Sequence, residues 1–126
     1  MNSPPPASGT AILDPPGPRA GQQRAYWRAP HGSALALAIA RLAQGHAGIV
    51  LAVARDTQSA QALETEIATF AGAALPVLHF PDWETLPYDL FSPHPDIVSQ
   101  RIAALYRLPA LARGVLVVPV ETLMQR

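Results

Sequence analysis

Three short, mainly apolar runs, the second of them weaker because it contains His79, divide this chain into alternating kinds of segment. The runs are Ile49–Ala54, Pro76–Phe80 and Val115–Val118, and stretches with the apolar spacing of helices lie between them. Short runs rich in β-branched side chains are typical of strands buried on both faces, as in a parallel sheet. Strands that alternate with helices predict an α/β fold, an open parallel sheet with right-handed crossovers.

Three helices are predicted, at Ser33–Gln44, at Thr57–Ala71 and from just after Asp96 to Leu108. The second is the best delimited, because an Asp before it is a good N-cap and a Gly follows it. Apolar residues at helical spacing are expected to be buried: Leu35, Ile39 and Leu42 in the first helix, Ala60, Leu63, Ile67 and Phe70 in the second, and Val98, Ile102 and Leu105 in the third.

The two ends of the chain differ from the middle. Residues 1–21 are rich in Pro, Gly and Ser, a composition that predicts a disordered lead before one α/β domain at residues 22–126. A further strand, which would bring the number to four, is expected near Arg24–Arg28, and a fourth helix near Glu121. Because no stop signal precedes Arg126, we expect the domain to be cut short and the chain to be part of something longer.

The composition excludes several classes of protein. Nine basic and nine acidic residues give a net charge of zero, without the basic excess usual in proteins that bind duplex DNA. The absence of Cys excludes disulfides and thiolate metal sites, and the four scattered His residues predict no metal site. No secretory signal and no apolar run long enough to span a bilayer are present, so a cytoplasmic location is expected.

A turn between a strand and a helix often holds phosphate, and the candidate here is Gly32, Ser33, Ala34, Leu35 and Ala36. A working phosphate loop needs a second Gly, a Lys for the terminal phosphates and a Ser or Thr for Mg²⁺. Ala34, Leu35 and Ala36 stand at those three positions, and the chain has no Lys. The sequence therefore predicts no bound cofactor and no ATP hydrolysis. Gly32 marks either a simple helix entry or a degenerate nucleotide loop.

Residues 81–95 form a long connection without regular pattern, a kind of loop that is usually functional or disordered. The aromatic residues Trp83, Tyr88 and Phe91 argue against disorder, because they supply apolar area that can fix the loop. Three roles stay open: packing onto the sheet edge, docking of another protein, and stacking of single-stranded nucleic acid. The neighbouring acids disfavour the third role. They also have no nucleophile beside them, so general acid–base catalysis is disfavoured.

The run from Phe80 to Ile97, built around Asp82-Trp83-Glu84-Thr85-Leu86-Pro87-Tyr88-Asp89, closely resembles the amino-terminal region of bacterial transcription-repair coupling factors. Arg101, the segment from Arg113 to Arg126, and His46-Ala47-Gly48 fit the same pattern. The resemblance covers about residues 22–126. Its distinctive positions, where contact with a partner is conceivable, are Asp82, Trp83, Glu84, Pro87, Tyr88, Asp89, Ser92, Pro93 and Arg101.

The resemblance implies a partial RecA-like domain, similar to UvrB, with a degenerate phosphate loop. Members of the family are ATP-driven DNA translocases that displace RNA polymerase stalled at lesions and recruit nucleotide-excision repair through UvrA. ATP and Mg²⁺ would belong to a motor domain beyond this segment, which would itself be a non-catalytic interaction and regulatory module. The alternatives are a helicase-like fragment that contacts DNA directly and a truncated product without a stable fold.

Overall fold

The computed structural model describes residues 15, 17–27, 30–85, 90 and 92–125. Four α-helices, three strands and one short 3-10 helix follow one another in the order α1 (Ala34–Gly45), β1 (Ile49–Ala54), α2 (Thr57–Ala71), β2 (Val77–His79), α3 (Pro95–Arg107), η2 (Leu108–Ala110), β3 (Gly114–Pro119) and α4 (Val120–Met124). The lead predicted at residues 1–21 lies mostly outside the described residues. Within the described part, no helix is both long and apolar enough to cross a membrane.

The three strands form one small open sheet in the order β1-β3-β2, and both pairings are parallel. Ile49 of β1 lies opposite Gly114 of β3, and Val77 of β2 lies opposite Val115 of β3. The predicted mixed α/β fold with a parallel sheet is therefore confirmed. The further strand near Arg24–Arg28 is not found: residues 24–27 form no strand, and Tyr26, at 85% exposed, does not pack on the sheet.

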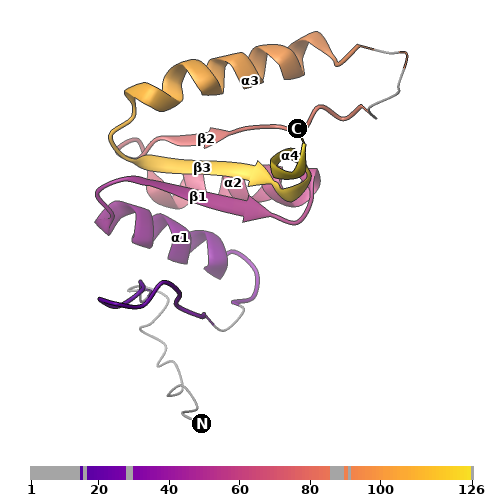
Figure 1. Cartoon of the computed structure of the whole chain (residues 1–126). Coiled ribbons are helices and arrows are strands. Elements are labelled where there is room, and N and C mark those ends of the chain that lie inside the picture. Colours follow the sequence, from indigo (N-terminus) through magenta and orange to yellow (C-terminus); the bar gives the residue numbers. More distant parts are fainter. Residues whose placement is uncertain (1–14, 16, 28–29, 86–89, 91, 126) are drawn as a thin grey trace.

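One face of the sheet carries the core. Helices α1 and α2 pack against each other and against this face (Figure 1). Alternate strand residues point toward them, so that Ala52 and Ala54 of β1 and Val115 and Val117 of β3 are buried. On the opposite face, Leu51 stays about half exposed. Beyond the edge strand β2 lies α3, which approaches the sheet only there (Figure 1).

The buried face of α1 agrees only in part with the prediction, because Ile39 packs against the core while partly buried and Leu42 is half-buried. Leu35, expected in the core, is 37% exposed, whereas Ala36, Ala40 and Ala43 are buried. These small side chains allow the backbone of α1 to approach β1, β3 and α2 closely. The larger apolar residues of α1 lie around the edge of this contact. The same correction applies to one position of α2: Phe70 is 40% exposed. Elsewhere in α2, burial of Ala60 and Ile67 is confirmed.

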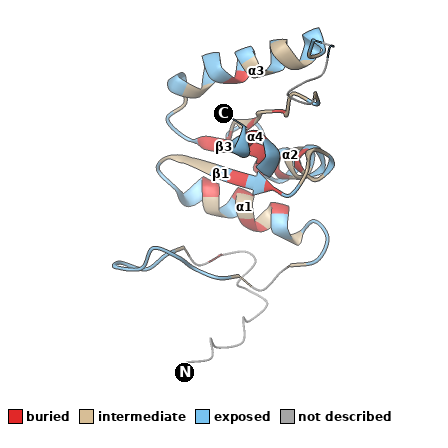
Figure 2. Cartoon of the chain, turned by 45° about the vertical axis from the view of Figure 1, so that its right-hand side comes forward, coloured by how far each residue is buried: buried red, intermediate tan, exposed pale blue. Residues whose placement is uncertain are grey.

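The prediction for α3 was also wrong. Ile102 is 61% exposed and Leu105 57%, and Ala104 is the buried residue of this helix. Figure 2 shows α3 mostly in the colours of exposed and intermediate residues. The reason is geometric, because α3 lies beside a strand of only three residues, and Ala104 is the one residue of the helix that is buried.

Candidate functional site at the carboxyl edge of the sheet

The carboxyl ends of the three strands lie at one edge of the sheet (Figure 1), where open α/β sheets commonly bind ligands. β1 leads there into Arg55 and Asp56, β2 into the distinctive loop, and β3 into α4. α1 begins on the same side. The parallel topology thus collects the predicted site residues in one region, although they are spread over the sequence.

Arg101 of α3 fixes the start of the distinctive loop. Its Nη1 donates a hydrogen bond to the carbonyl oxygen of Pro81 at 2.6 Å. Its guanidinium carbon lies 4.2 Å from the ring centre of Phe80 and 4.0 Å from that of Trp83. A flat, weakly hydrated guanidinium is suited to such stacking on aromatic faces. Arg101, Phe80, Pro81 and Trp83 are called the Arg101 cluster below.

The charge of Arg101 is partly desolvated in this cluster. Burial lowers the pKa of Arg101 below its ordinary value, and the negative charge of Asp82 opposes that shift. This guanidinium occupies one face of the Phe80 ring and one face of the Trp83 ring. Of the three roles left open for the loop, the geometry therefore favours packing onto the fold over stacking of single-stranded nucleic acid.

Asp82 joins the loop to the end of the described chain. Its Oδ1 accepts hydrogen bonds from Thr122 Oγ1 at 3.3 Å and from Gln125 Nε2 at 2.6 Å. Its Oδ2 accepts from the backbone N–H of Glu84 at 3.0 Å, which stabilises the left-handed φ of 56° at Glu84. Thr122 is buried, so its hydroxyl depends on this partner. One carboxylate therefore connects the exit of β2 with α4.

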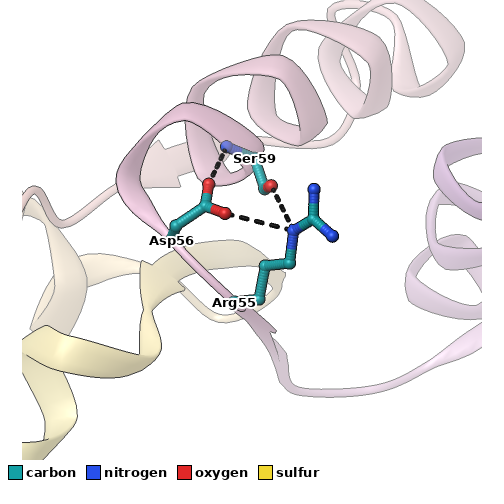
Figure 3. A network of polar contacts seen from close by, with 3 residues as sticks. All are labelled: Arg55, Asp56 and Ser59. Carbon is teal, nitrogen blue, oxygen red and sulfur yellow. Dashed lines mark hydrogen bonds and ion pairs between the residues drawn. The ribbon is translucent and has the colours of Figure 1, made fainter.

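Asp56 closes the amino end of α2 (Figure 3). Its Oδ1 accepts from the backbone N–H of Ser59 at 2.7 Å, while Arg55 Nε donates to Asp56 Oδ2 at 3.1 Å and to Ser59 Oγ at 3.2 Å. The hydrogen bond from the Ser59 N–H is the largest cause that lowers the pKa of Asp56 below its usual value. Because this carboxylate already occupies the helix terminus, α2 does not offer that terminus to a phosphate.

The candidate phosphate loop is an ordinary helix entry in its contacts. Gly32 has a φ of 57°, α1 begins at Ala34, and the side chain of Ser33 makes no capping hydrogen bond. Leu35 points partly to solvent and Ala36 is fully buried in the core. No side chain from Gly32 to Ala36 therefore supplies a cation for phosphate, and Ala36 stands where a hydroxyl for Mg²⁺ would be needed. Descent from a nucleotide loop stays a prediction.

The remaining predicted residues are less informative. Ser92 is exposed and Pro93 half-buried, while Pro87, Tyr88 and Asp89 lie outside the described residues. Sequence reasoning missed Thr122 and Gln125, since nothing local marks them as partners of a residue some forty positions earlier. Among the described residues, no three acidic or imidazole side chains gather closely enough to hold a metal ion.

The fold and this edge define a mixed α/β domain whose loops are fixed by an arginine–aromatic cluster and a carboxylate node. No family model matches the chain. Two curated proteins do, both named transcription-repair-coupling factor. The protein from Escherichia coli strain K12 is 50% identical over 108 residues, which are 86% of this chain and 9% of the relative. The protein from Haemophilus influenzae is 42% identical over 91 residues, 72% of this chain and 8% of the relative.

Over most of its length this chain is therefore homologous to transcription-repair-coupling factors, and the family resemblance drawn from the sequence is confirmed. The chain spans less than a tenth of the length of these curated relatives.

Proposed function

We propose that this chain is a non-catalytic interaction and regulatory module of a transcription-repair coupling factor. The observation that carries the proposal is the 50% identity over 86% of the chain to a protein of that name. In such a factor, an ATP-driven translocase displaces RNA polymerase stalled at a DNA lesion and recruits the excision machinery. The proposal places the factor in the cytoplasm and gives this segment two tasks, to help recruit UvrA and to restrain the motor.

The absence of phosphate chemistry supports the non-catalytic part of the proposal. Phosphoryl transfer depends on positioned cations for nearly all of its catalysis. The chain has no Lys, and the candidate loop places Leu35 and the buried Ala36 where a cation and a hydroxyl would be needed. Asp56 in turn occupies the N-terminus of α2. The module is proposed as a RecA-like domain that keeps its architecture without the nucleotide.

Nucleotide binding is the direct test. Radiolabelled ATP and Mg²⁺ are titrated against the purified chain in equilibrium dialysis, with a functional ATPase as the positive control. We expect no saturable binding at micromolar nucleotide. Micromolar, Mg²⁺-dependent binding would contradict the degenerate loop, and with it the non-catalytic role.

Recruitment is tested separately. The chain is immobilised and purified UvrA is passed over it, with Arg101→Ala as the variant that loosens the distinctive loop and Arg41→Ala, on the exposed side of α1, as the control. We expect saturable binding of UvrA that is weaker for Arg101→Ala and unchanged for Arg41→Ala.

Single-stranded DNA in place of UvrA tests the alternative function, direct nucleic-acid contact. Salt-dependent DNA binding that falls in Trp83→Ala would favour that alternative.

A further inference from the structure

A groove runs along the open edge of the sheet, next to the Arg101 cluster. Its volume is about 420 Å³, and all three residues of β2 line it. Gln61 and Glu64 of α2 form one wall. The other wall is α3, through Gln100 and Arg107. In Figure 1 the groove corresponds to the region where α3 lies alongside β2.

The backbone of β2 presents unpaired hydrogen-bonding groups to this groove. In the described part of the chain, β2 pairs only with β3. The carbonyl of Pro76 accepts from Val115, and the N–H of Phe80 donates to Val117, so residues 76, 78 and 80 turn their backbone groups toward β3. Strand geometry alternates, and the N–H and C=O groups of Val77 and His79 therefore point outward, toward the groove. An added strand would find four such groups there.

His79 supplies a second, independent observation. Its side chain is only 10% exposed, and Nδ1 lies 3.0 Å from Glu64 Oε2. Its other nitrogen, Nε2, is buried and has no hydrogen-bond partner among the described residues. An unpaired buried polar atom is costly, by about 1–3 kcal/mol. Glu64 thus orients the imidazole, and the same contact holds the Glu64 carboxylate in the wall of the groove.

The free charge of the groove is positive. Arg107, in the last turn of α3, forms no salt bridge with any described residue. Glu64 is already engaged with His79. An entering carboxylate can accept a hydrogen bond from the guanidinium of Arg107. The same guanidinium would repel a lysine side chain.

From these contacts we propose that the groove between α2 and α3 binds an extended peptide segment that adds as a strand to the open edge of β2 and carries an acidic side chain toward Arg107. Main-chain pairing with Val77 and His79 supplies the affinity, and the acidic side chain supplies the selectivity. The inference does not rest on the proposed function, since it uses only the edge strand and the groove.

The test uses an octapeptide of alternating valine and glutamate, added to the isotopically labelled 126-residue chain. Amide hydrogen exchange is followed by NMR at millimolar peptide. We expect exchange at the amides of Val77 and His79 to slow at least about tenfold, because opening of the edge then requires release of the peptide. A peptide of alternating valine and lysine should give no such protection.

One charge variant and its control assign the contact to this groove. Arg107→Gln removes the free cation and should weaken binding of the glutamate peptide by about tenfold. Arg41→Gln, on α1, should leave it unchanged. Because Arg107 is exposed, its variant is expected to fold, which a thermal melt would reveal.

Several outcomes would overturn the inference. One is unchanged exchange at Val77 and His79 with the glutamate peptide at millimolar concentration. Protection of β1, the other edge of the sheet, in place of β2 is another. A third is equal affinity of the wild-type chain and Arg107→Gln. N-acetylglutamate serves as the last probe: if it shifts the Arg107 and His79 signals as strongly as the octapeptide does, the groove is a site for small carboxylates and no strand is added.

Discussion

The guanidinium of Arg101 lies 4.0 Å from the ring centre of Trp83, and it bridges from the middle of α3 to the loop that leaves β2. The same group donates to the carbonyl oxygen of Pro81. The side chain of Arg101 thereby fixes α3 to the loop that leaves β2. Among the described residues, the contacts of α3 with the sheet lie mainly at β2, and this bridge adds to what holds the helix in place.

Loss of Arg101 should therefore destabilise the chain. Arg101→Ala removes two ring contacts and one hydrogen bond from a half-buried position, and we expect the free energy of unfolding to fall by about 1–2 kcal/mol. Arg101→Lys keeps the charge but cannot stack a flat group on two rings, so it should recover less than half of the loss. Urea denaturation followed by circular dichroism measures both. Equal stability of wild type and Arg101→Ala would show that the cluster is not stabilising.

Asp82 and Thr122 should be energetically coupled. Asp82→Ala removes the acceptor of a buried hydroxyl, and Thr122→Val removes that hydroxyl. The double variant should therefore be more stable than the sum of the two single changes predicts, by about 0.5–1.5 kcal/mol. Additive effects would show that the 3.3 Å contact carries no energy. Amide exchange in α4 should accelerate in Asp82→Ala and stay unchanged in Asp96→Ala, whose carboxylate is 81% exposed.

The distinctive loop shows how far sequence reasoning reaches. The sequence predicts that Trp83 fixes the loop, because aromatic residues in an irregular segment need something to pack against, whereas Arg101 is singled out by the family resemblance. Phe80 as the second ring was not named, nor was the hydrogen bond from Thr122 to Asp82. Contacts between residues forty positions apart depend on the parallel topology, which brings the ends of β2 and β3 together, and no local pattern records them.

The elements themselves were predicted far better than their orientations. The bounds of β1 and α2 agree with the sequence-based ranges, because an unbroken apolar run and a capped helix are local signals. Helix faces are not local. α1 buries alanines in place of Leu35, since only small side chains allow close approach to two layers at once.

The finding that Ile102 and Leu105 of α3 are exposed can be checked by measuring stability. Ile102→Gln or Leu105→Gln should change the free energy of unfolding by no more than about 0.5 kcal/mol, because more than half of each side chain is in water. Ile67→Ala, in the core at 0% exposed, should cost about 2–5 kcal/mol as the matched reference. A large loss for either glutamine variant would mean that the face of α3 first predicted from the periodicity is the buried one.

The cap at Asp56 predicts a dependence of stability on pH. Because the pKa of Asp56 in the folded chain lies below its usual value of 3.8, its contribution is present above that pH and is lost as pH falls through the folded pKa. Asp56→Ala should therefore lower the Tm at pH 6, and the gap to the wild type should narrow below pH 4. Asp56→Asn keeps a capping acceptor without a titrating charge, and its Tm should lack this step. A gap for Asp56→Ala that is constant from pH 6 to pH 2 would contradict the prediction.

Gly114 at the start of β3 should be the least replaceable glycine among those described. Its φ is 154°, a backbone conformation that side chains rarely adopt, and an added Cβ would lie 2.7 Å from the carbonyl oxygen of Pro76. That oxygen accepts the hydrogen bond from Val115 that begins the pairing of β2 with β3. Gly114→Ala must therefore either strain the backbone or separate the strands, and we expect the free energy of unfolding to fall by about 2–3 kcal/mol, as measured by urea denaturation.

The control for this variant is Gly45→Ala, at the end of α1 with open space around it, which should be neutral or slightly stabilising by the same denaturation measurement. Similar stabilities for the two variants would mean that β2 and β3 do not approach each other at Pro76, and the amide of Val115 would then exchange as fast as an unpaired one.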